Sequence, residues 1–439
     1  MDQRLFDEFL RMESEYKLFD LKEPFFSPVW DVLRVELFNS HILRPSSGNN
    51  RYRRSLLEKI RSRSCQLFKG LMWPRKLDYV FVYSPIIVNS HGRLYDRMAE
   101  DLISFTKNAR CMYLGAVELS YKAEHRDYGL FYFRLMASFG SRSLNLSYQN
   151  YDLIHQAIQN TFNIDIAYNV VNAIFRLYVK EYFAYKLFLS WIHPKKVFVS
   201  MDLQKGLYVA AKERNIPTCE IQHGCLVYQY PSYSYPASIN STSNVAFADT
   251  FAMPGEGWGL DNCMPCKKRV ILGNSHFGGI CSHVGSDGSI VIISNAIHCK
   301  YLIPFSISLS KIYQGKIIYK LHPLEYPHID EYKKEFEGYS NIEIAPIDSD
   351  MSELLAKCSL VVTISSTVFF EAKTMGKRVA ILKEDNYYII ESYVKSSHNT
   401  CIIEKAEDVF EALKMPESSD DVKYYLSFDV DVAKELLND

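Results

Sequence analysis

Hydrophobic stretches of two kinds alternate along most of this chain. Short runs rich in β-branched and aromatic residues, such as 78–83 (DYVFVY) and 289–294 (SIVIIS), are typical of buried strands. Longer segments such as 95–106 and 301–313 lie between them, and their apolar residues recur at helical spacing. Strands that alternate with helices in this way predict parallel sheets covered by helices.

The alternation forms two series. The first has expected strands at 78–83, 110–114, 195–200, 217–222 and 247–253, and a long helical region at 151–192. The second has expected strands at 289–294, 316–321, 341–344, 360–364 and 378–382. We therefore expect an α/β protein with two Rossmann-like domains, spanning 77–272 and 283–415 and linked through 271–279. Residues 1–76 are expected to form a helical N-terminal extension, basic in its second half, and 416–439 closing helices.

Composition narrows the class of protein. The chain has 439 residues, of which 48% are hydrophobic and 23% charged, so it is globular and can bury sizeable cores. A net charge of −1 argues against a molecule built as a whole to bind nucleic acid. Its ten cysteines are scattered, several inside expected strands or helices, which suits reduced thiols in the cytoplasm. The pair Cys263 and Cys266 has no second pair to complete a zinc site, and we expect no metal.

The start of the chain shows no signal-peptide pattern, and no apolar run reaches the roughly 18 residues that span a bilayer. We therefore expect a cytoplasmic protein. One segment, 44–76, carries ten basic residues against the single acid Glu58, with apolar residues between them. Such a segment is either an amphipathic helix on the inner face of an anionic membrane or a solvated helix or linker.

Polar residues follow two strands of the second series. The strand at 316–321 ends at His322-Pro323, and the strand at 360–364 runs into Ser365, Ser366 and Thr367. Ligands of open α/β sheets bind at the carboxyl ends of strands, and hydroxyls at the start of a helix suit an anion. Glu371 lies one turn into the following helix, where it could accept hydrogen bonds from a ribose diol. Each feature alone is common at strand ends and N-caps; the pairing indicates a site.

Three motifs together resemble those of GT-B glycosyltransferases that build bacterial capsule and lipopolysaccharide O-antigen. They are Gln222-His223-Gly224, His322-Pro323 and Ser365-Ser366, and the resemblance covers roughly 78–415. It implies a cytoplasmic enzyme that moves a sugar from a nucleotide-sugar to a saccharide acceptor, held on a lipid, without a metal or a further cofactor. It also implies that His322, Ser365, Ser366 and Thr367 contact the donor phosphate, Glu371 the ribose, and Ser294 and Asn295 the donor.

The first domain should supply the general base for the acceptor hydroxyl. His223 ends a strand facing the second domain, and Gly224 would allow a sharp turn. The carboxylates of Asp202 and Glu256 end strands on the same rim and compete for this role, and His223 could instead be structural. His91 and Gly92, after the first strand, are further candidates for contact with substrate.

Other functions on related motifs stay open. Sialyltransferases with HP and SS motifs use an acidic turn as base, and the first domain has none, which argues against a CMP-sialic acid donor. The polyol-phosphate polymerases of wall teichoic acid share the histidine-glycine and HP turns, so a CDP-polyol donor is an alternative. A UDP-N-acetylhexosamine 2-epimerase would need several carboxylates in the first domain. A scaffold without activity would not depend on His322 or Glu371.

Overall fold

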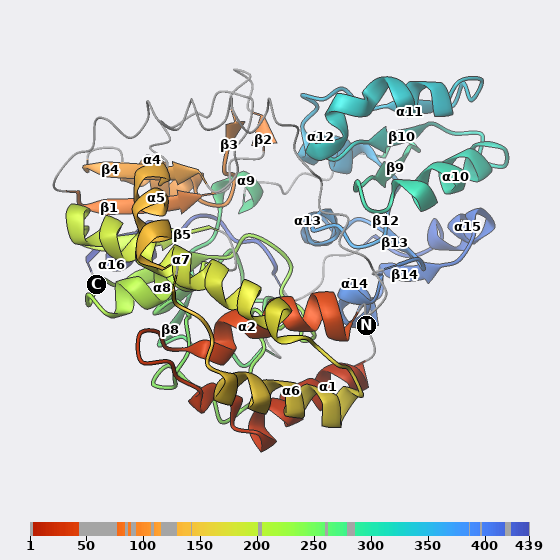
Figure 1. Cartoon of the computed structure of the whole chain (residues 1–439). Coiled ribbons are helices and arrows are strands. Elements are labelled where there is room, and N and C mark those ends of the chain that lie inside the picture. The colour runs from red at the N-terminus through yellow and green to blue at the C-terminus, as the bar shows by residue number, and fades with distance from the viewer. Residues whose placement is uncertain are drawn as a thin grey trace.

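Two parallel sheets form the framework of the chain (Figure 1). The computed structural model describes residues 3–43, 77–83, 87–88, 94–106, 109–115, 130–141, 143–200, 204–259, 262–278, 286–385, 387–395, 397–417 and 423–438. Within these residues each main sheet has six strands, and neighbouring strands pair in parallel. The expectation of an α/β protein with two Rossmann-like domains is therefore confirmed.

The first sheet is built from short apolar strands, and its centre is fully buried. In spatial order the strands are β4 (Cys111–Gly115), β1 (Tyr79–Tyr83), β5 (Lys196–Val199), β6 (Thr218–Ile221), β7 (Thr250–Met253) and β8 (Lys268–Ile271). A small antiparallel hairpin, β2 (Ile87–Val88) and β3 (Leu94–Tyr95), follows β1. The helices of this domain are α4 (Glu100–Phe105), α5 (Phe131–Gly140), α6 (Tyr148–Phe162), α7 (Tyr168–Ile192), α8 (Lys205–Lys212) and α9 (Ser275–Gly278).

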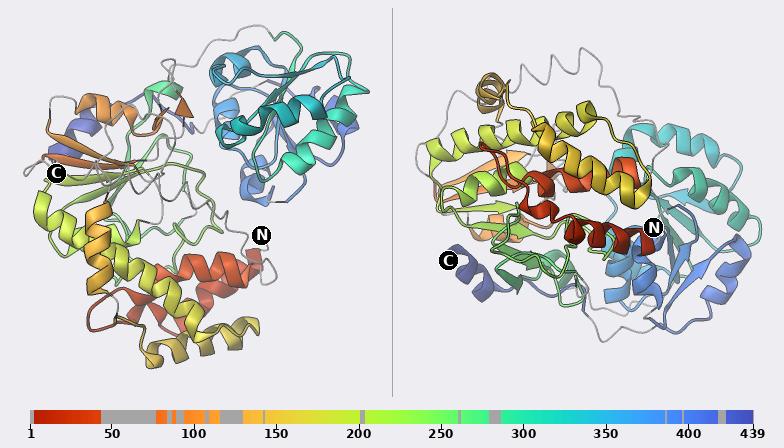
Figure 2. Two further views of the ribbon diagram at one scale, coloured as in Figure 1. Left: turned by 45° about the horizontal axis from the view of Figure 1, so that its top comes forward. Right: turned by 60° about the horizontal axis from the view of Figure 1, so that its bottom comes forward.

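The N-terminal helices belong to the core of the first domain. α1 (Gln3–Glu15) and α2 (Val29–Leu37), followed by a π-helical turn (Phe38–Ile42), lie along α6 and α7 (Figure 2). Phe9 and Trp30 share one apolar cluster with Phe175 of α7. Within 3–43 the chain is helical, as expected, and these helices pack on the first domain. The basic part, 44–76, lies outside the described residues.

The second sheet has the strand order of a dinucleotide-binding fold. Its strands are β11 (Ile342–Ile344), β10 (Ile317–Lys320), β9 (Ile290–Ile293), β12 (Leu360–Thr363), β13 (Val379–Leu382) and β14 (Thr400–Ile403). Its helices are α10 (Cys299–Ser310), α11 (Ile329–Glu335), α12 (Met351–Lys357), α13 (Val368–Thr374), α14 (Tyr388–Lys395) and α15 (Val409–Ala412). The order reverses between β9 and β12, and such a switch point is where ligands of these sheets bind.

The end of the chain returns to the first domain. We call residues 423–429 the strap; it hydrogen-bonds along the loop after β7, from Leu426 N to Pro254 O at 2.8 Å and from Glu256 N to Lys423 O at 2.9 Å. Helix α16 (Val430–Asn438) then packs on the first sheet, where Lys196 Nζ donates to Leu436 O at 2.6 Å. Figure 1 shows α16 beside the first sheet, far from the rest of the second domain.

Several elements differ from their predicted extent. The helical region expected at 151–192 is two helices, because Asn163 adopts a left-handed conformation (φ 55°) and ends α6. Strand β8, which was not predicted, ends at Ile271 where the predicted linker begins, and helix α9 lies within that linker. The sequence reading missed β14 and α14.

Candidate functional site

Three of the predicted donor residues occupy one row at the edge of the second sheet. The register pairs Lys320 with Ile293 and Val362 with Ile292, so β9, β10 and β12 end side by side. Asn295, His322 and Ser365 each lie two residues beyond the end of their strand, and each is partly exposed. The residue before each of them is buried. At about 4.8 Å per strand spacing, the strand ends that carry His322 and Ser365 lie about 10 Å apart.

His322 is held in one orientation and one tautomer. It caps the 3₁₀ helix Pro323–His328, where its Nδ1 accepts a hydrogen bond from Leu324 N at 3.2 Å. Its own backbone N–H donates to Glu325 Oε2 at 2.7 Å. Burial lowers the pKa of His322, although Glu325 acts in the other direction. A neutral ring whose Nδ1 accepts carries its proton on Nε2, which can therefore donate to a ligand.

Ser294 does not reach this edge, contrary to the prediction. It is buried, and its hydroxyl donates to Glu325 Oε1 at 2.8 Å and lies 3.0 Å from the Tyr319 hydroxyl. Glu325 also accepts from the Tyr332 hydroxyl. Glu325 therefore ties the ends of β9 and β10 together, a role that no pattern in the sequence predicted. Asn295 Oδ1 accepts from Ile297 N at 3.2 Å and shapes the turn after β9.

The serine turn leads to a contact between the two domains. Ser366 Oγ accepts from Val368 N at 3.2 Å, and Thr367, the N-cap residue of α13, makes no capping hydrogen bond with its side chain. Glu371 on α13 is 2% exposed, and its Oε1 accepts from Arg97 Nη2 of the first domain at 2.9 Å. Burial raises the pKa of Glu371, and Arg97 opposes this rise. In this structure, then, the carboxylate predicted to meet a ribose binds an arginine.

The QHG turn lies on the corresponding edge of the first sheet. Gln222 is 2% exposed; its Nε2 donates to Gly224 O at 2.9 Å and its backbone N–H to Ala252 O at 2.9 Å. His223, two residues beyond the end of β6, is partly exposed. Gln222 Oε1 and His223 Nδ1 are buried without a hydrogen-bond partner in the described part of the chain. This turn therefore holds polar atoms that a ligand could satisfy.

The structure gives less support to the remaining candidate residues of the first domain. Gly224 has no left-handed φ, and a Cβ there would meet nothing within 4 Å, so the backbone does not require glycine. Glu256 is exposed, and the backbone of its loop hydrogen-bonds to the strap. His91, Gly92 and Asp202 lie outside the described residues.

The QHG turn and Arg97 approach the second domain together. Leu226, three residues after His223, packs in one apolar cluster with Phe370 of α13, and its carbonyl accepts from the Tyr393 hydroxyl. Figure 1 shows α13 and α14 on the side of the second domain that faces the first. The carboxyl edges of both sheets thus meet in one region. The sequence held no signal for Arg97, because only the tertiary fold brings it to Glu371.

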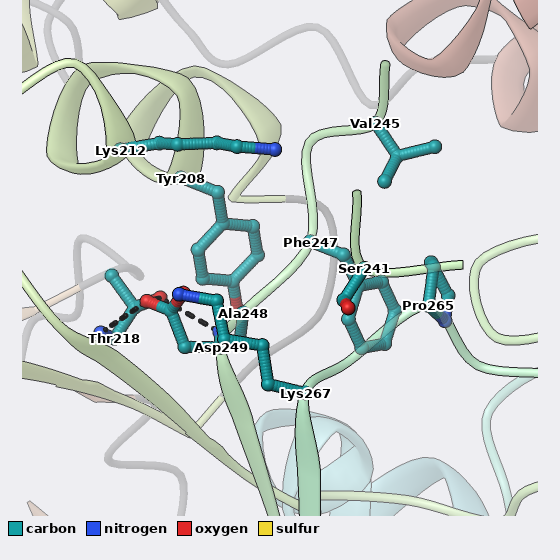
Figure 3. Close-up of a pocket in the computed structure, with 10 residues that line it drawn as sticks. All are labelled: Tyr208, Lys212, Thr218, Ser241, Val245, Phe247, Ala248, Asp249, Pro265 and Lys267. Carbon is teal, nitrogen blue, oxygen red and sulfur yellow. Dashed lines mark hydrogen bonds and ion pairs between the residues drawn. The ribbon is translucent and has the colours of Figure 1, made fainter. Parts of the chain in front are cut away.

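A separate cavity lies on the opposite edge of the first sheet. It is lined by Tyr208, Lys212, Thr218, Ser241, Val245, Phe247, Ala248, Asp249, Pro265 and Lys267 (Figure 3). Thr218 begins β6 and Asp249 precedes β7, so the cavity is at the amino ends of these strands. Burial acts against ionisation of Asp249, but Lys267 at 2.7 Å and Thr218 at 2.9 Å hold its pKa below the usual value. These bonds join strand starts, and we assign the cavity no ligand.

In the described residues no cluster of His, Cys, Asp and Glu could hold a metal ion. None of the helices found there is long and apolar enough to cross a membrane.

Comparison with known proteins identifies likenesses of fold. No family model and no curated protein matches the sequence. Among solved structures, the chain is similar to MnaA of S. aureus bound to UDP (15% identity, TM-score 0.46), which covers 83% of this chain and 95% of that one. It is also similar to the UDP-GlcNAc 2-epimerase of Methanocaldococcus jannaschii, with 14% identity, a TM-score of 0.47, and coverage of 83% of this chain and 98% of that one. MurG of Acinetobacter baumannii shows 9% identity and a TM-score of 0.42, over 76% of this chain and 90% of that one. The fold of this chain is established by the strand orders of its two sheets. Likenesses of 15% identity or less give it no function.

Proposed function

We propose that this protein is a glycosyltransferase that takes a sugar from a nucleotide-sugar and passes it to a saccharide acceptor. The observation that carries the proposal is the row of Asn295, His322 and Ser365 at the switch point of the second sheet. A diphosphate is an anion rich in acceptor oxygens, and this row presents an N–H and a hydroxyl. Surface polysaccharide synthesis and a lipid-linked acceptor, which the motifs imply, belong to the same proposal.

The donor half of the reaction would use second-domain residues. His322 Nε2–H and the hydroxyls of Ser365 and Thr367 would donate to the phosphates and stabilise the negative charge that develops on the leaving nucleotide. Donors already fixed by Glu325 and by the turn need little reorganisation when that charge appears. Arg97 adds a cation beside α13, the helix that follows the serine turn, 2.9 Å from Glu371. A ribose diol would have to share Glu371 with Arg97 or displace it.

The acceptor half would use the QHG turn. We assign to His223 the removal of the proton from the acceptor hydroxyl, with the sugar transferred as that proton leaves. The partly exposed His223 ring lies at the carboxyl edge of the first sheet. The buried amide oxygen of the neighbouring Gln222 has no hydrogen-bond partner in the described residues and could accept a hydrogen bond from the acceptor. Asp202, outside the described residues, stays a competing base.

Nuclear magnetic resonance of reactions with a panel of UDP-, GDP-, CMP-, CDP- and dTDP-sugars would test this proposal. We expect one donor to lose its sugar, by transfer or slow hydrolysis, with release of the nucleotide, and we expect His223→Gln to slow release by roughly 10²- to 10⁴-fold. Lys212→Gln, in the separate cavity, is the matched control.

Other products would contradict the proposal and indicate a different enzyme. Inversion at C2 of a UDP-sugar without net transfer would mean an epimerase, and release of CMP from a CDP-polyol would mean a polyol-phosphate transferase. If no donor is consumed and no nucleotide binds, the chain is no transferase.

A further inference from the structure

Helix α5 carries large apolar side chains on its outer side. Phe133 and Ala137 of this helix are buried, and the Phe133 ring lies 5.7 Å from that of Phe188 on α7. Leu135, Met136 and Phe139 point the other way and are about half exposed. Packing against α7 therefore uses one side of α5 and leaves an apolar side in solvent.

Helix α7 continues this surface. Its exposed apolar residues are Leu177, Leu187 and Trp191. At 100° per residue they lie within about 80° of one another around the helix, next to the side that carries Phe188. Figure 1 shows α5 lying across α7 on the outside of the first domain, and Figure 2 shows the same contact. We call these six residues the α5/α7 apolar face; each is between 38% and 60% exposed.

The clustering of these side chains requires an explanation. Single exposed apolar residues are ordinary on a protein surface, whereas several on two helices that pack together indicate a contact site. Half of the twelve large apolar side chains that are exposed in the described part of the chain lie on these two helices. The others are spread over both domains, among them Phe410 on α15 and Ile297 after β9.

The charges on the two helices indicate which partner fits. They carry four basic side chains and one acid, Glu181; Lys186 is paired with Glu213 at 2.9 Å, and the other three basic residues are Arg134, Arg176 and Lys180. Burial raises the pKa of Glu181, and the nearby Arg134 acts against this. The surface is thus apolar with a basic surround in a protein whose net charge is −1. Exposed apolar side chains, a tryptophan and flanking cations are what a helix at an anionic bilayer surface presents.

We propose that the α5/α7 apolar face docks the first domain on an anionic phospholipid bilayer. Leu135, Met136, Phe139 and Trp191 enter the boundary between headgroups and acyl chains, and Arg134, Arg176 and Lys180 meet the phosphates. This contact is distinct from any made by the basic segment 44–76. It depends neither on the donor site nor on the identity of the sugar.

Vesicle flotation of the full chain tests the proposal, with phosphatidylcholine vesicles and with vesicles rich in phosphatidylglycerol. We expect binding to the anionic vesicles only, and weaker binding at high salt, because salt screens the cations. Replacing Leu135, Met136 and Phe139 by serine should reduce the partition coefficient roughly tenfold or more. Leu187→Ser with Trp191→Ser gives a second variant on the other helix. Phe410→Ser, with a similarly exposed side chain on the second domain, is the matched control and should bind as the unmodified protein does.

Each other result overturns the proposal. Unchanged binding in both variants would assign the membrane contact elsewhere, for instance to 44–76. Absence of binding to either vesicle would remove the membrane as partner. If sedimentation without vesicles shows a dimer that the serine variants dissociate, the face joins two copies of the chain. Thermal unfolding of each variant checks its fold, and exposed positions should leave it nearly unchanged.

Discussion

At the scale of single residues, the candidate site depends on one buried carboxylate, that of Glu325. Glu325 accepts from the backbone N–H of His322, from the Ser294 hydroxyl and from the Tyr332 hydroxyl. Glu325 fixes the position of His322 relative to β9. The Nδ1 atom of His322 in turn accepts a hydrogen bond from Leu324 N. The orientation of the Nε2–H donor is therefore set before any ligand arrives.

Replacing Glu325 by glutamine should disturb this arrangement. A neutral amide accepts through one oxygen only, and its NH₂ group would face hydroxyl and N–H donors. We expect a loss of about 1–3 kcal/mol in the free energy of unfolding and weaker nucleotide binding, measured by urea unfolding and calorimetry. Glu335→Gln, at an exposed position on α11, should change stability by less than about 0.5 kcal/mol. Equal effects of both variants would contradict the role given to Glu325.

Because the pKa of His322 is lowered in the folded state, the stability of the protein should depend on pH. The folded pKa of His322 lies below the unfolded value of about 6.5. The unfolded state therefore binds more protons between these two values, and the contribution of His322 to stability is complete above pH of about 6.5 and falls as the pH drops below it. We expect the stability difference between the unmodified protein and His322→Gln to be larger at pH 7.5 than at pH 5.5. Urea unfolding at both pH values measures it, and a difference independent of pH would refute the assignment.

The sequence predicted the position of the site residues better than their partners. His322, Ser365 and Asn295 could be placed at strand ends because apolar runs with a following Pro, Ser or Asn show where strands stop. Both faces of β9 are buried, so no alternation along the strand shows where Ser294 points, and its bond to Glu325 has no local signal either. Arg97 and Glu371 are 274 residues apart, and no local pattern announces such a contact.

At the scale of elements, the strap holds the loop after β7 in place. Trp258 Nε1 donates to Tyr424 O at 2.5 Å, and the Trp258 ring lies 4.2 Å from that of Phe370 on α13. The strap therefore packs where the two domains meet. Its residues were predicted only as part of closing helices, since an irregular segment has no periodicity to detect.

Gly255 gives a direct test of this packing. A Cβ on Gly255 would lie 2.4 Å from the backbone of Tyr424, so the strap would have to move. We expect Gly255→Ala to lower the midpoint of thermal unfolding by several degrees, corresponding to about 1–3 kcal/mol. Gly224→Ala, where a Cβ meets nothing within 4 Å, is the matched control for stability and should be nearly neutral. A neutral Gly255→Ala would mean that the strap does not bear on this loop.

The break between α6 and α7 shows how a local signal can be outweighed. Both halves have helical periodicity, so the pattern predicted one helix. Ser147 caps the first, its side chain accepting from Asn150 N at 3.3 Å, and Asn163 ends it. Asparagine is a common left-handed residue at helix ends, so the break could have been predicted from Asn163 had its capping role been weighed above the periodicity.

At the scale of the whole molecule, the Arg97–Glu371 ion pair couples the two domains at the candidate site. Glu371 is 2% exposed and Arg97 18% exposed, so the pair is largely removed from water. Arg97→Ala would leave the Glu371 carboxylate buried without this partner. We expect the free energy of unfolding to fall by an amount on the order of 2 kcal/mol. This is less than the ~3–5 kcal/mol for breaking a fully buried pair, because Arg97 keeps some contact with solvent.

A double-mutant cycle with Glu371→Ala isolates the coupling. The double variant should be more stable than the sum of the two single losses implies. The exposed pair Lys333–Asp330, at 2.9 Å on α11, is the comparison, and Lys333→Ala should cost about 0–1 kcal/mol. Strict additivity at Arg97 and Glu371 would show that the contact does not hold the domains together in solution.

The central claim, a nucleotide site at the switch point of the second sheet, is tested most directly by calorimetric titration with UDP, GDP, CMP, CDP and dTDP. We predict that one of these binds with a stoichiometry of one, and that His322→Ala weakens it by roughly 10- to 100-fold, the loss expected for one hydrogen bond to a charged group. Lys212→Gln, at the opposite edge of the first sheet, should bind it unchanged. Binding that survives in His322→Ala and fails in Lys212→Gln would contradict the account.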